Sequence, residues 1–366
     1  EIPLLSVCKG RVNWNRFYNF LFHILCINDN AVYCQHGGGN PLEAFTIRNL
    51  SFAYPETEVD VLKDINFSVI EGEFLTVCGA SGSGKSTLLR LLKPSLAPHG
   101  RLSGEIRFHE IGINEFSQRQ ECKKIGFVQQ SPDNQIVTDK VWHELAFGLE
   151  SLGLKNEEIR RRVAETASFF GIEQYFEGDV TTLSGGQKQL LNLASVMAMQ
   201  PEVLILDEPT SQLDPIAASD FIACLHRINK ELGVTVIISE HRTEELLPIS
   251  DRVLILDDGA VLSLDTPLHT GENLSSCDDR LFTLLPSAMH IWRAVDTSSD
   301  CPVTVAQGRE WLRSCVSTHD TYPLYPEIIP PCGVPFSGKP IPATSAFSIA
   351  EMMEMTFLSR MPIDHI

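Results

Sequence analysis

The sequence is short of basic residues. Its 366 residues include 29 Lys and Arg against 47 Asp and Glu, which gives a formal net charge of -18. Proteins that bind nucleic acid usually carry a basic face that neutralises phosphates. A nucleic-acid partner is therefore disfavoured, although a local basic patch is compatible with this composition.

Cysteine patterns that build disulfide or zinc frameworks are also missing. The ten cysteines form no CxxC pair and no Cys/His spacing of the zinc-binding kind, and they are too thinly spread for a small disulfide-stapled domain. We therefore expect reduced thiols in a cytosolic protein and predict no disulfide framework.

The most apolar early run is too short to cross a bilayer. It covers residues 17–27 (FYNFLFHILCI) and contains Asn19 and His23. Basic residues before it give a faint resemblance to a secretory signal, but the sequence behind it is typical of a cytosolic protein. Because the sequence begins with Glu1 rather than Met, we expect a fragment of a longer chain.

The remaining composition is that of a globular α/β protein. It is 43% hydrophobic and 21% charged, has no internal repeat, and breaks at GGGNP (residues 37–41) before the first periodic segment near Glu43. Short apolar runs between helical patterns predict buried parallel strands with a small antiparallel portion. These runs lie at residues 44–47, 61–69, 74–78, 203–206, 234–238 and 253–256.

Four segments are predicted along the chain. Helical spacing at residues 139–174 indicates a helical subdomain, and a second helix-rich piece follows Pro286 with Thr304 as its predicted cap. Prolines after residue 322 indicate a semi-rigid linker. The segments are a poorly defined extension (1–42), a main domain (43–270, helical subdomain about 131–182), a small helical extension (271–317) and a Pro-rich linker or tail (318–366).

Residues 79–86, GASGSGKS, fit the phosphate-loop pattern GxxxxGK(S/T) between a strand-like and a helix-like run. The glycines let backbone N–H groups converge on phosphates at a helix N-terminus. Lys85 adds a charge for the β and γ oxygens, and Ser86 can ligate Mg²⁺. The predicted contacts are Gly79, Ala80, Ser81, Gly82, Ser83, Gly84, Lys85, Ser86 and Thr87.

A second run, residues 203–206, ends in two acids. A buried strand can deliver such carboxylates to a nucleotide site, where Asp207 would hold Mg²⁺ through water and Glu208 would act as general base on the attacking water. The alternative is a strand that simply ends in solvated acids.

The stretch LSGGQ (residues 183–187) places two glycines where a helix begins. A helix N-terminus offers free N–H groups, and glycine lets an anion approach them closely. Since residues 79–86 already hold one γ-phosphate, we expect this turn to serve a nucleotide held by another chain. The alternative is a serine-capped helix with adventitious glycines. The residues concerned are Ser184, Gly185, Gly186 and Gln187.

The order of these motifs, followed by LILDEPTSQLD (204–214) and His241 in ISEHR, resembles the ATP-binding cassette (ABC) ATPases. The resemblance covers about residues 43–267. It implies an α/β P-loop NTPase fold of ABC type, with a mixed β core, an antiparallel β subdomain and a helical signature subdomain. It also implies a head-to-tail dimer that binds ATP and Mg²⁺ between one phosphate loop and the other subunit's LSGGQ.

Further roles follow from the resemblance. Tyr54 matches the aromatic that stacks on adenine, with a core tyrosine as the alternative. Gln130 matches the glutamine that reaches Mg²⁺ and water, although Gln129 beside it leaves a question of register. Asp214 matches an acid that communicates across the dimer, and His241 a switch that contacts the γ-phosphate. The catalytic set is Glu208, His241, Lys85 and Gln130, and the metal set is Ser86, Gln130 and Asp207.

The sequence departs from the family pattern at Leu190, where an arginine is frequent. We expect little effect on catalysis, because the position belongs to the helix body.

Residues 131–154 and the later PSAMHIW and CPVTVAQGREWL resemble the ATPases of energy-coupling-factor importers, which take up vitamins and transition-metal ions. This implies a transmembrane coupling protein, a separate substrate-capture membrane protein, and a location at the cytoplasmic face of the cell membrane. The partner ATPase is identical, separate or fused, and residues 346–357 resemble the first strand of a following cassette. The alternative is that residues 141–149 are only a core-facing helix.

Other ABC proteins are alternatives in function. An ATPase of another importer or exporter would differ only in its membrane partner. A soluble DNA-repair member needs a long coiled coil, for which the interval between Gly84 and Leu183 has no room, and ribosome-acting members carry basic arms.

Overall fold

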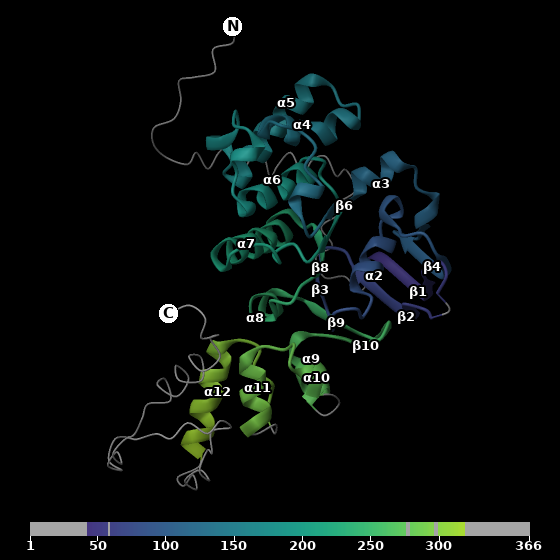
Figure 1. Cartoon of the computed structure of the whole chain (residues 1–366). Helices are drawn as coiled ribbons and strands as arrows, with labels where there is room; N and C mark the ends of the chain where they lie inside the picture. The colour runs from purple at the N-terminus through teal and green to yellow at the C-terminus, as the bar shows by residue number, and fades with distance from the viewer. Residues whose placement is uncertain (1–41, 58, 276–278, 296–298, 319–366) are drawn as a thin grey trace, which may run out of the picture. The chain divides into compact units, whose positions relative to one another are not determined.

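A computed structural model describes residues 42–57, 59–275, 279–295 and 299–318. The chain divides into two units, residues 1–316 and 317–366, and nearly all of the described residues belong to the first. The apolar run at residues 17–27, the Pro-rich segment and the predicted strand at 346–357 lie outside the described residues. Figure 1 labels the elements.

The six-stranded sheet has the order β10-β9-β3-β8-β7-β6. Its strands are parallel except β10, which pairs antiparallel with β9. Each inner strand is an apolar run buried on both faces, as helices on both sides require. The strands are β3 (Phe74–Cys78), β6 (Ile125–Val128), β7 (Val203–Asp207), β8 (Thr235–Ser239), β9 (Arg252–Asp257) and β10 (Ala260–Asp265).

A second, antiparallel sheet has the order β2-β1-β4-β5. Arg252 of the first sheet ties the two together, because its Nε and Nη2 lie 2.6 and 2.8 Å from the carboxylate oxygens of Glu73, and Nη2 also donates to the carbonyl oxygen of Ser68 in β2. The strands are β1 (Glu43–Ala53), β2 (Leu62–Ile70), β4 (Arg101–Phe108) and β5 (Ile111–Gly112). Of these, β4 and β5 were not predicted, because the first half of β4 is exposed and lacks an apolar run.

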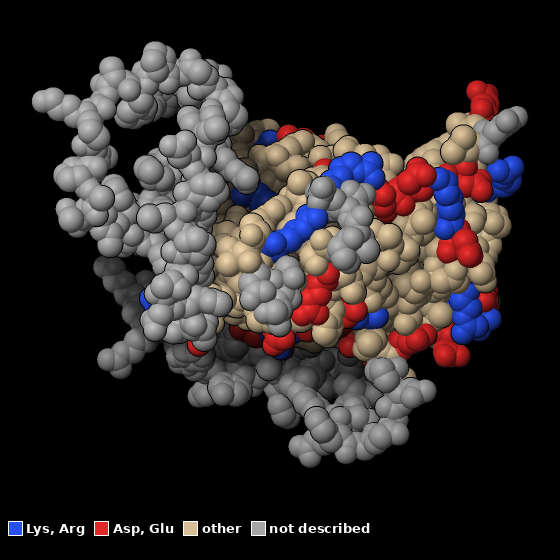
Figure 2. Space-filling model, turned by 90° about the horizontal axis from the view of Figure 1, so that it is seen from below, with Lys and Arg blue, Asp and Glu red and all other residues tan. Residues whose placement is uncertain are grey.

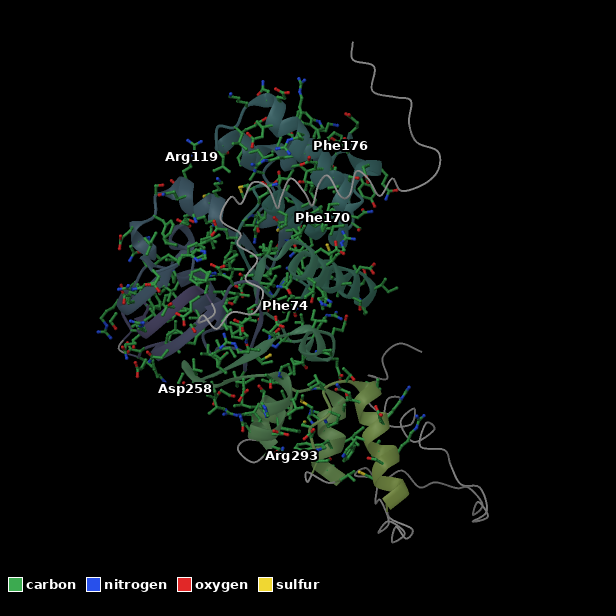
Figure 3. All side chains as sticks on the ribbon, turned by 180° about the vertical axis from the view of Figure 1, so that it is seen from behind. Phe74, Arg119, Phe170, Phe176, Asp258 and Arg293 are labelled. Atoms are coloured by element: carbon green, nitrogen blue, oxygen red, sulfur yellow. The ribbon has the colours of Figure 1, made fainter. Side chains whose placement is uncertain are left out.

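Helices α4, α5 and α6 pack together as a helical subdomain (Figure 1). Phe74 of β3 and Phe170 of α5, both labelled in Figure 3, belong to the buried cluster that joins this subdomain to the parallel sheet. The helices of the main domain are α2 (Lys85–Leu91), α3 (Gln118–Lys124), α4 (Val141–Ser151), α5 (Asn156–Phe170), α6 (Gly185–Ala198), α7 (Pro215–Leu232) and α8 (Thr243–Leu246). Short 3₁₀ turns are η1 (Pro94–Leu96), η2 (Ile113–Glu115), η3 (Pro132–Asn134), η4 (Glu173–Tyr175), η5 (Val180–Thr182) and η6 (Leu247–Ile249).

Four further helices follow β10 among the described residues. Trp292 and Trp311 are buried among them, and their indole Nε1 atoms donate to the carbonyl and hydroxyl oxygens of Ser299. Thr304 caps the last helix, since its Oγ1 accepts from the Gln307 N–H. The helices are α9 (Pro267–Ser275), α10 (Asp279–Phe282), α11 (Ser287–Val295) and α12 (Val305–Thr318), and the predicted boundary at residue 270 falls within α9.

The surface carries both signs of charge. Figure 2 shows acidic and basic side chains interspersed on the face that it presents. Within the described part of the chain, no helix combines the length and the apolar character needed to span a membrane.

Candidate nucleotide site

The loop between β3 and α2 needs its glycines. Gly84, the residue before α2, has φ +101°, and Gly82 has φ +83°, a region that residues with a Cβ rarely adopt. A Cβ on Gly79 would lie 2.2 Å from the carbonyl oxygen of Leu256. The loop is therefore held against β9. The Ser83 hydroxyl is buried and has no hydrogen-bond partner among the described residues.

Lys85 is held inside this loop. Its side chain is buried, and Nζ donates to the carbonyl oxygens of Gly79 at 2.9 Å and Ala80 at 3.0 Å. Burial lowers the pKa of Lys85, while the nearby Glu208, Cys78 and Asp207 oppose that change. The loop thus holds a cation against its own carbonyl oxygens.

Asp207 faces the start of α2. Its Oδ1 accepts from the Ser86 hydroxyl at 2.8 Å and from the Ser239 hydroxyl at 3.0 Å, and Arg90 Nη2 lies 3.8 Å from Oδ2. Asp207 and Ser239 are register partners at the carboxyl ends of β7 and β8. The parallel sheet therefore brings two predicted metal residues, Ser86 and Asp207, into contact.

Glu208, the residue after Asp207, contacts Gln130 and His241. Gln130 Nε2 donates to Oε2 at 3.1 Å, and His241 Nε2 lies 3.1 Å from Oε1. The backbone of Gln129 is held by its neighbours, since its N–H donates to Gln135 Oε1 and its carbonyl oxygen accepts from Gln189 Nε2. The structure thus brings three of the four predicted catalytic residues together, and it is Gln130, not Gln129, that reaches Glu208.

Tyr54 lies at the edge of the phosphate loop. Its hydroxyl oxygen is 3.0 Å from Thr87 Oγ1, and its half-buried ring makes an edge-to-face contact with Phe52, with centroids 5.1 Å apart. The ring therefore packs on the antiparallel sheet and touches the first turn of α2 at once.

The LSGGQ turn begins α6 with a capping box. Ser184 Oγ accepts from the Gln187 N–H at 3.3 Å, and Gln187 Oε1 accepts from the Ser184 N–H at 2.8 Å. The glycines differ: a Cβ on Gly186 would lie 2.8 Å from the Cβ of Ala217, whereas one on Gly185 would meet nothing within 4 Å. The turn is a capped helix start, and Gly185 leaves its outer surface open.

Asp214 begins the neighbouring helix α7. Its Oδ1 accepts from the N–H groups of Ile216 and Ala217, each at 3.0 Å. Because Ala217 is the residue against which Gly186 packs, Asp214 and the LSGGQ turn are structurally linked. Neither hydrogen-bonds to the cluster around Lys85 and Glu208 among the interactions of the described residues.

Glu240 is a buried residue of this region that the sequence interpretation missed. Its Oε1 accepts from the N–H of Thr210 at 2.7 Å and from the hydroxyl of Thr210 at 2.6 Å, and its Oε2 accepts from the His241 N–H at 3.0 Å. This carboxylate links Thr210, in the turn after Glu208, to the backbone of His241. An acid two residues after the apolar run at residues 234–238 was the available signal.

The comparisons with known proteins identify the family. The ABC transporter family profile matches residues 62–211. A protein of Pyrococcus abyssi assigned as an ABC transporter ATP-binding protein is 37% identical over 248 residues, which are 67% of this chain and 88% of that protein. The chain belongs to the ABC transporter family. It carries an ABC ATPase domain that binds ATP.

Longer ABC relatives also match. An ABC transporter ATP-binding protein of Bacillus cereus is 42% identical over 265 residues, covering 72% of this chain and 47% of the relative. The chain spans about half the length of the first curated relatives that it matches.

Solved ABC cassettes share the fold. The structure of cbiO1 from Clostridium perfringens, part of the ABC transporter complex cbiONQ, matches with a TM-score of 0.57 and 32% identity, covering 66% of this chain and 98% of cbiO1. The ATP-binding cassette MJ0796, a dimer in a post-hydrolysis state with ADP and Pi, matches with a TM-score of 0.53 and 28% identity, covering 61% and 98%. The predicted fold class is confirmed.

Proposed function

We propose that this ABC domain hydrolyses ATP between two cassettes and drives a membrane importer of the energy-coupling-factor type, which takes up a vitamin or a transition-metal ion. The observation that carries the proposal is the grouping of Glu208, Gln130 and His241 beside Lys85, Ser86 and Asp207 at one edge of the parallel sheet. In α/β proteins, ligands bind at the carboxyl (C-terminal) ends of the parallel strands.

In this proposal the residues have separate roles in phosphoryl transfer. Lys85 and the loop N–H groups bind the phosphates, and Tyr54 packs on the adenine. Glu208 is the general base for the attacking water, and Gln130 and His241 hold its two oxygens in place. Catalysis of this kind depends on positioning, which the two hydrogen bonds supply.

The residues present also fit Mg²⁺. Magnesium prefers hard oxygen ligands, and the Ser86 hydroxyl, the Asp207 carboxylate and the Gln130 amide would hold it. Ser86 and Asp207 are already within 2.8 Å of each other. When bound, the ion neutralises charge on the phosphate oxygens.

The second ATP-facing surface comes from a partner cassette in this proposal. Ser184 and Gly185 are exposed and lie at a helix N-terminus, where N–H groups attract phosphate. Support also comes from MJ0796, whose cassettes form dimers with ADP and Pi. We assign residues 43–270 to the ATPase domain and residues 271–317 to pairing of the two ATPases.

The importer assignment rests on cbiO1 and on three exposed apolar side chains. Val137, Trp142 and Phe147, at the start of the helical subdomain, are 66, 40 and 41% exposed. These side chains follow Gln130 closely in the chain and could contact a helix of a transmembrane protein. Binding to such a helix would place the chain at the cytoplasmic face of the membrane.

The test is purification of the chain with its membrane partners from detergent-solubilised membranes. We expect two membrane proteins, one for coupling and one for substrate capture, to co-purify with ATPase activity. The double variant Trp142→Ser, Phe147→Ser should lose them, while Leu262→Ser, which changes an equally exposed apolar residue on β10, should not. Recovery with ribosomes in place of membrane proteins would contradict the proposal.

A further inference from the structure

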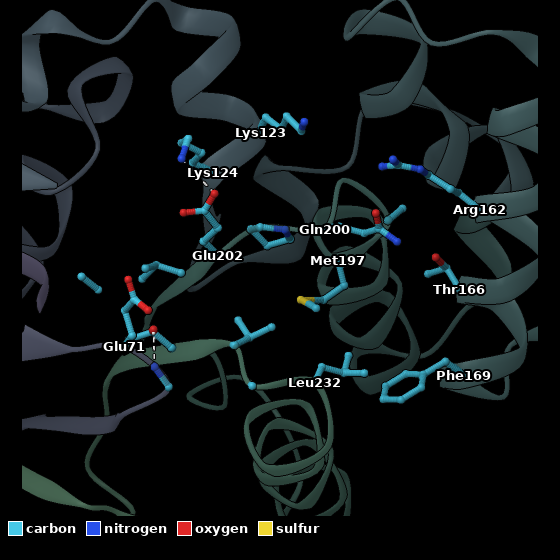
Figure 4. A pocket seen from close by; sticks show the side chains of 18 of the residues that line it. Glu71, Lys123, Lys124, Arg162, Thr166, Phe169, Met197, Gln200, Glu202 and Leu232 are labelled. Carbon is cyan, nitrogen blue, oxygen red and sulfur yellow. Dashed lines mark hydrogen bonds and ion pairs between the residues drawn. The ribbon is translucent and has the colours of Figure 1, made fainter. Parts of the chain in front are cut away.

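A cavity of about 500 Å³ lies at the edge of the parallel sheet opposite the nucleotide site. Its lining includes the starts of β7 and β8 at Val203 and Thr235, whereas Asp207 and Ser239 at the far ends of these strands belong to the nucleotide site. Helix α5 and the end of α6 form the opposite wall (Figure 4). This volume is typical of small-molecule sites.

The acidic side chains that line the cavity already have basic side chains as partners within the protein. The pairs are Glu202 with Lys124 and with His109, each at 2.9 Å, Glu71 with His109 at 3.0 Å, and Glu165 with Arg161 at 3.3 Å.

Two cations of the lining are less well satisfied. Arg162 is only 7% exposed; its Nη2 donates to Glu158 at 2.8 Å, but its buried Nε has no hydrogen-bond partner among the described residues. Lys123, at the mouth, has no ion pair within that same part of the chain. Figure 4 shows the nitrogen-bearing ends of Arg162 and Lys123 directed toward each other across the pocket.

An unpartnered buried guanidinium N–H is costly unless a ligand satisfies it. The planar fork of arginine matches carboxylate and phosphate, and a lysine beside it adds a second attraction for the same anion. The cavity also has an apolar side formed by Met197, Leu232 and Phe169. The lining therefore combines an anion-binding end with an apolar body.

We propose that this cavity binds a small organic anion, an aromatic or aliphatic carboxylate or phosphate ester, at a site separate from that of ATP. The anionic group lies between Arg162 and Lys123, and the apolar body packs on Met197 and Leu232. Since Met197 lies at the end of α6 and the LSGGQ turn at its start, the site is about 20 Å from that turn along the helix.

The test uses the full chain with ¹³C-methyl-labelled methionine and saturating ADP, which keeps added phosphate compounds out of the phosphate loop. Among the seven methionines, the Met197 signal is assigned with Met197→Leu. We expect phenyl phosphate or benzoate to shift the Met197 signal saturably. The compound that binds more tightly shows whether the natural ligand is a phosphate or a carboxylate. An equal shift with neutral benzyl alcohol, or no saturable shift with either anion, would overturn the proposal.

Matched variants locate the anion. Arg162→Met should weaken binding about tenfold or more, because a charge-assisted hydrogen bond is lost. Arg160→Met, an exposed position on the same helix, should leave affinity unchanged. Lys123→Gln changes an exposed residue, so it tests the site even where Arg162→Met fails to fold, and it should also weaken binding. Wild-type affinity in Lys123→Gln and Arg162→Met would refute the assignment.

Discussion

Glu208 combines an uncommon backbone conformation with a firmly held carboxylate. Its φ of +45° lies in the left-handed region, which costs a residue with a Cβ about 1 kcal/mol or more. Hydrogen bonds from its N–H to the carbonyl and hydroxyl oxygens of Ser239 stabilise this conformation. The proposed base is thereby fixed at the carboxyl end of β7, directly after the proposed metal ligand Asp207.

Glu208→Gln should lower ATP turnover about 10²-fold or more, because the amide keeps the shape of the carboxylate and cannot accept a proton from water. ATP binding should remain, since Glu208 does not belong to the phosphate loop. Steady-state hydrolysis and nucleotide-binding assays measure the two effects separately. Lys85→Ala is the contrasting variant and should weaken nucleotide binding itself. Near-normal turnover in Glu208→Gln would remove Glu208 from the role of base.

Glu240→Gln tests whether this buried carboxylate positions His241. One of its three hydrogen bonds must be lost, because an amide nitrogen cannot accept from an N–H. We expect a loss of about 1–3 kcal/mol in the free energy of unfolding and a fall in kcat with little change in KM for ATP. Thr210→Val removes only the hydroxyl contact and should have the smaller effect. Wild-type kcat and urea stability in Glu240→Gln would show that Glu240 has no positioning role.

Helix α6 starts with two glycines that serve different ends. Gly186 is close to Ala217 of α7, so its lack of a Cβ is a packing requirement. Gly185 has open space around it, so packing within the chain does not explain it. The capping box and the proposed phosphate contact are therefore compatible, since the cap uses Ser184 and Gln187 side chains while Gly185 keeps the backbone accessible.

Gly186→Ala should destabilise the protein by about 1–3 kcal/mol, because the added methyl overpacks the contact between α6 and α7. Urea unfolding gives the change in free energy. Wild-type stability would mean that α6 shifts freely at this point and that the contact with Ala217 imposes no constraint.

Gly185→Ala should leave stability unchanged or raise it by up to about 1 kcal/mol, because alanine favours the helix and meets no neighbour. ATPase activity of the assembled cassettes should nevertheless fall, because the methyl stands between the helix N-terminus and the partner's ATP. Full ATPase activity together with wild-type stability would favour a helix start whose glycine is adventitious.

Two cassettes should associate when ATP is bound and hydrolysis is blocked. The full chain carrying Glu208→Gln should shift from monomer to dimer in analytical ultracentrifugation on addition of ATP and Mg²⁺, because the nucleotide adds contacts to both faces. Adding Gly185→Ala should abolish the shift without changing the monomer. Persistence of the dimer in that double variant would contradict a role for the LSGGQ turn at the interface.

The sequence determined the elements whose signals are local. Buried apolar runs gave the core strands β3, β7, β8 and β9, since burial on both faces selects continuous apolar residues. The phosphate loop was predictable because its glycines are needed for the local backbone conformation. The acids Asp207 and Glu208 were visible as a change from apolar to acidic residues at the end of a strand.

Tertiary structure decided everything that depends on pairing between distant residues. Strands β4, β5 and β10 took their place through pairing with β1, β4 and β9 respectively, since their own residues alternate weakly or are exposed. The choice of Gln130 over Gln129, the contact of Gly186 with Ala217 and the bonds of Glu240 join segments far apart in the chain. Such contacts are fixed by packing in three dimensions. The periodicity of a single segment does not reveal which distant segment it will contact.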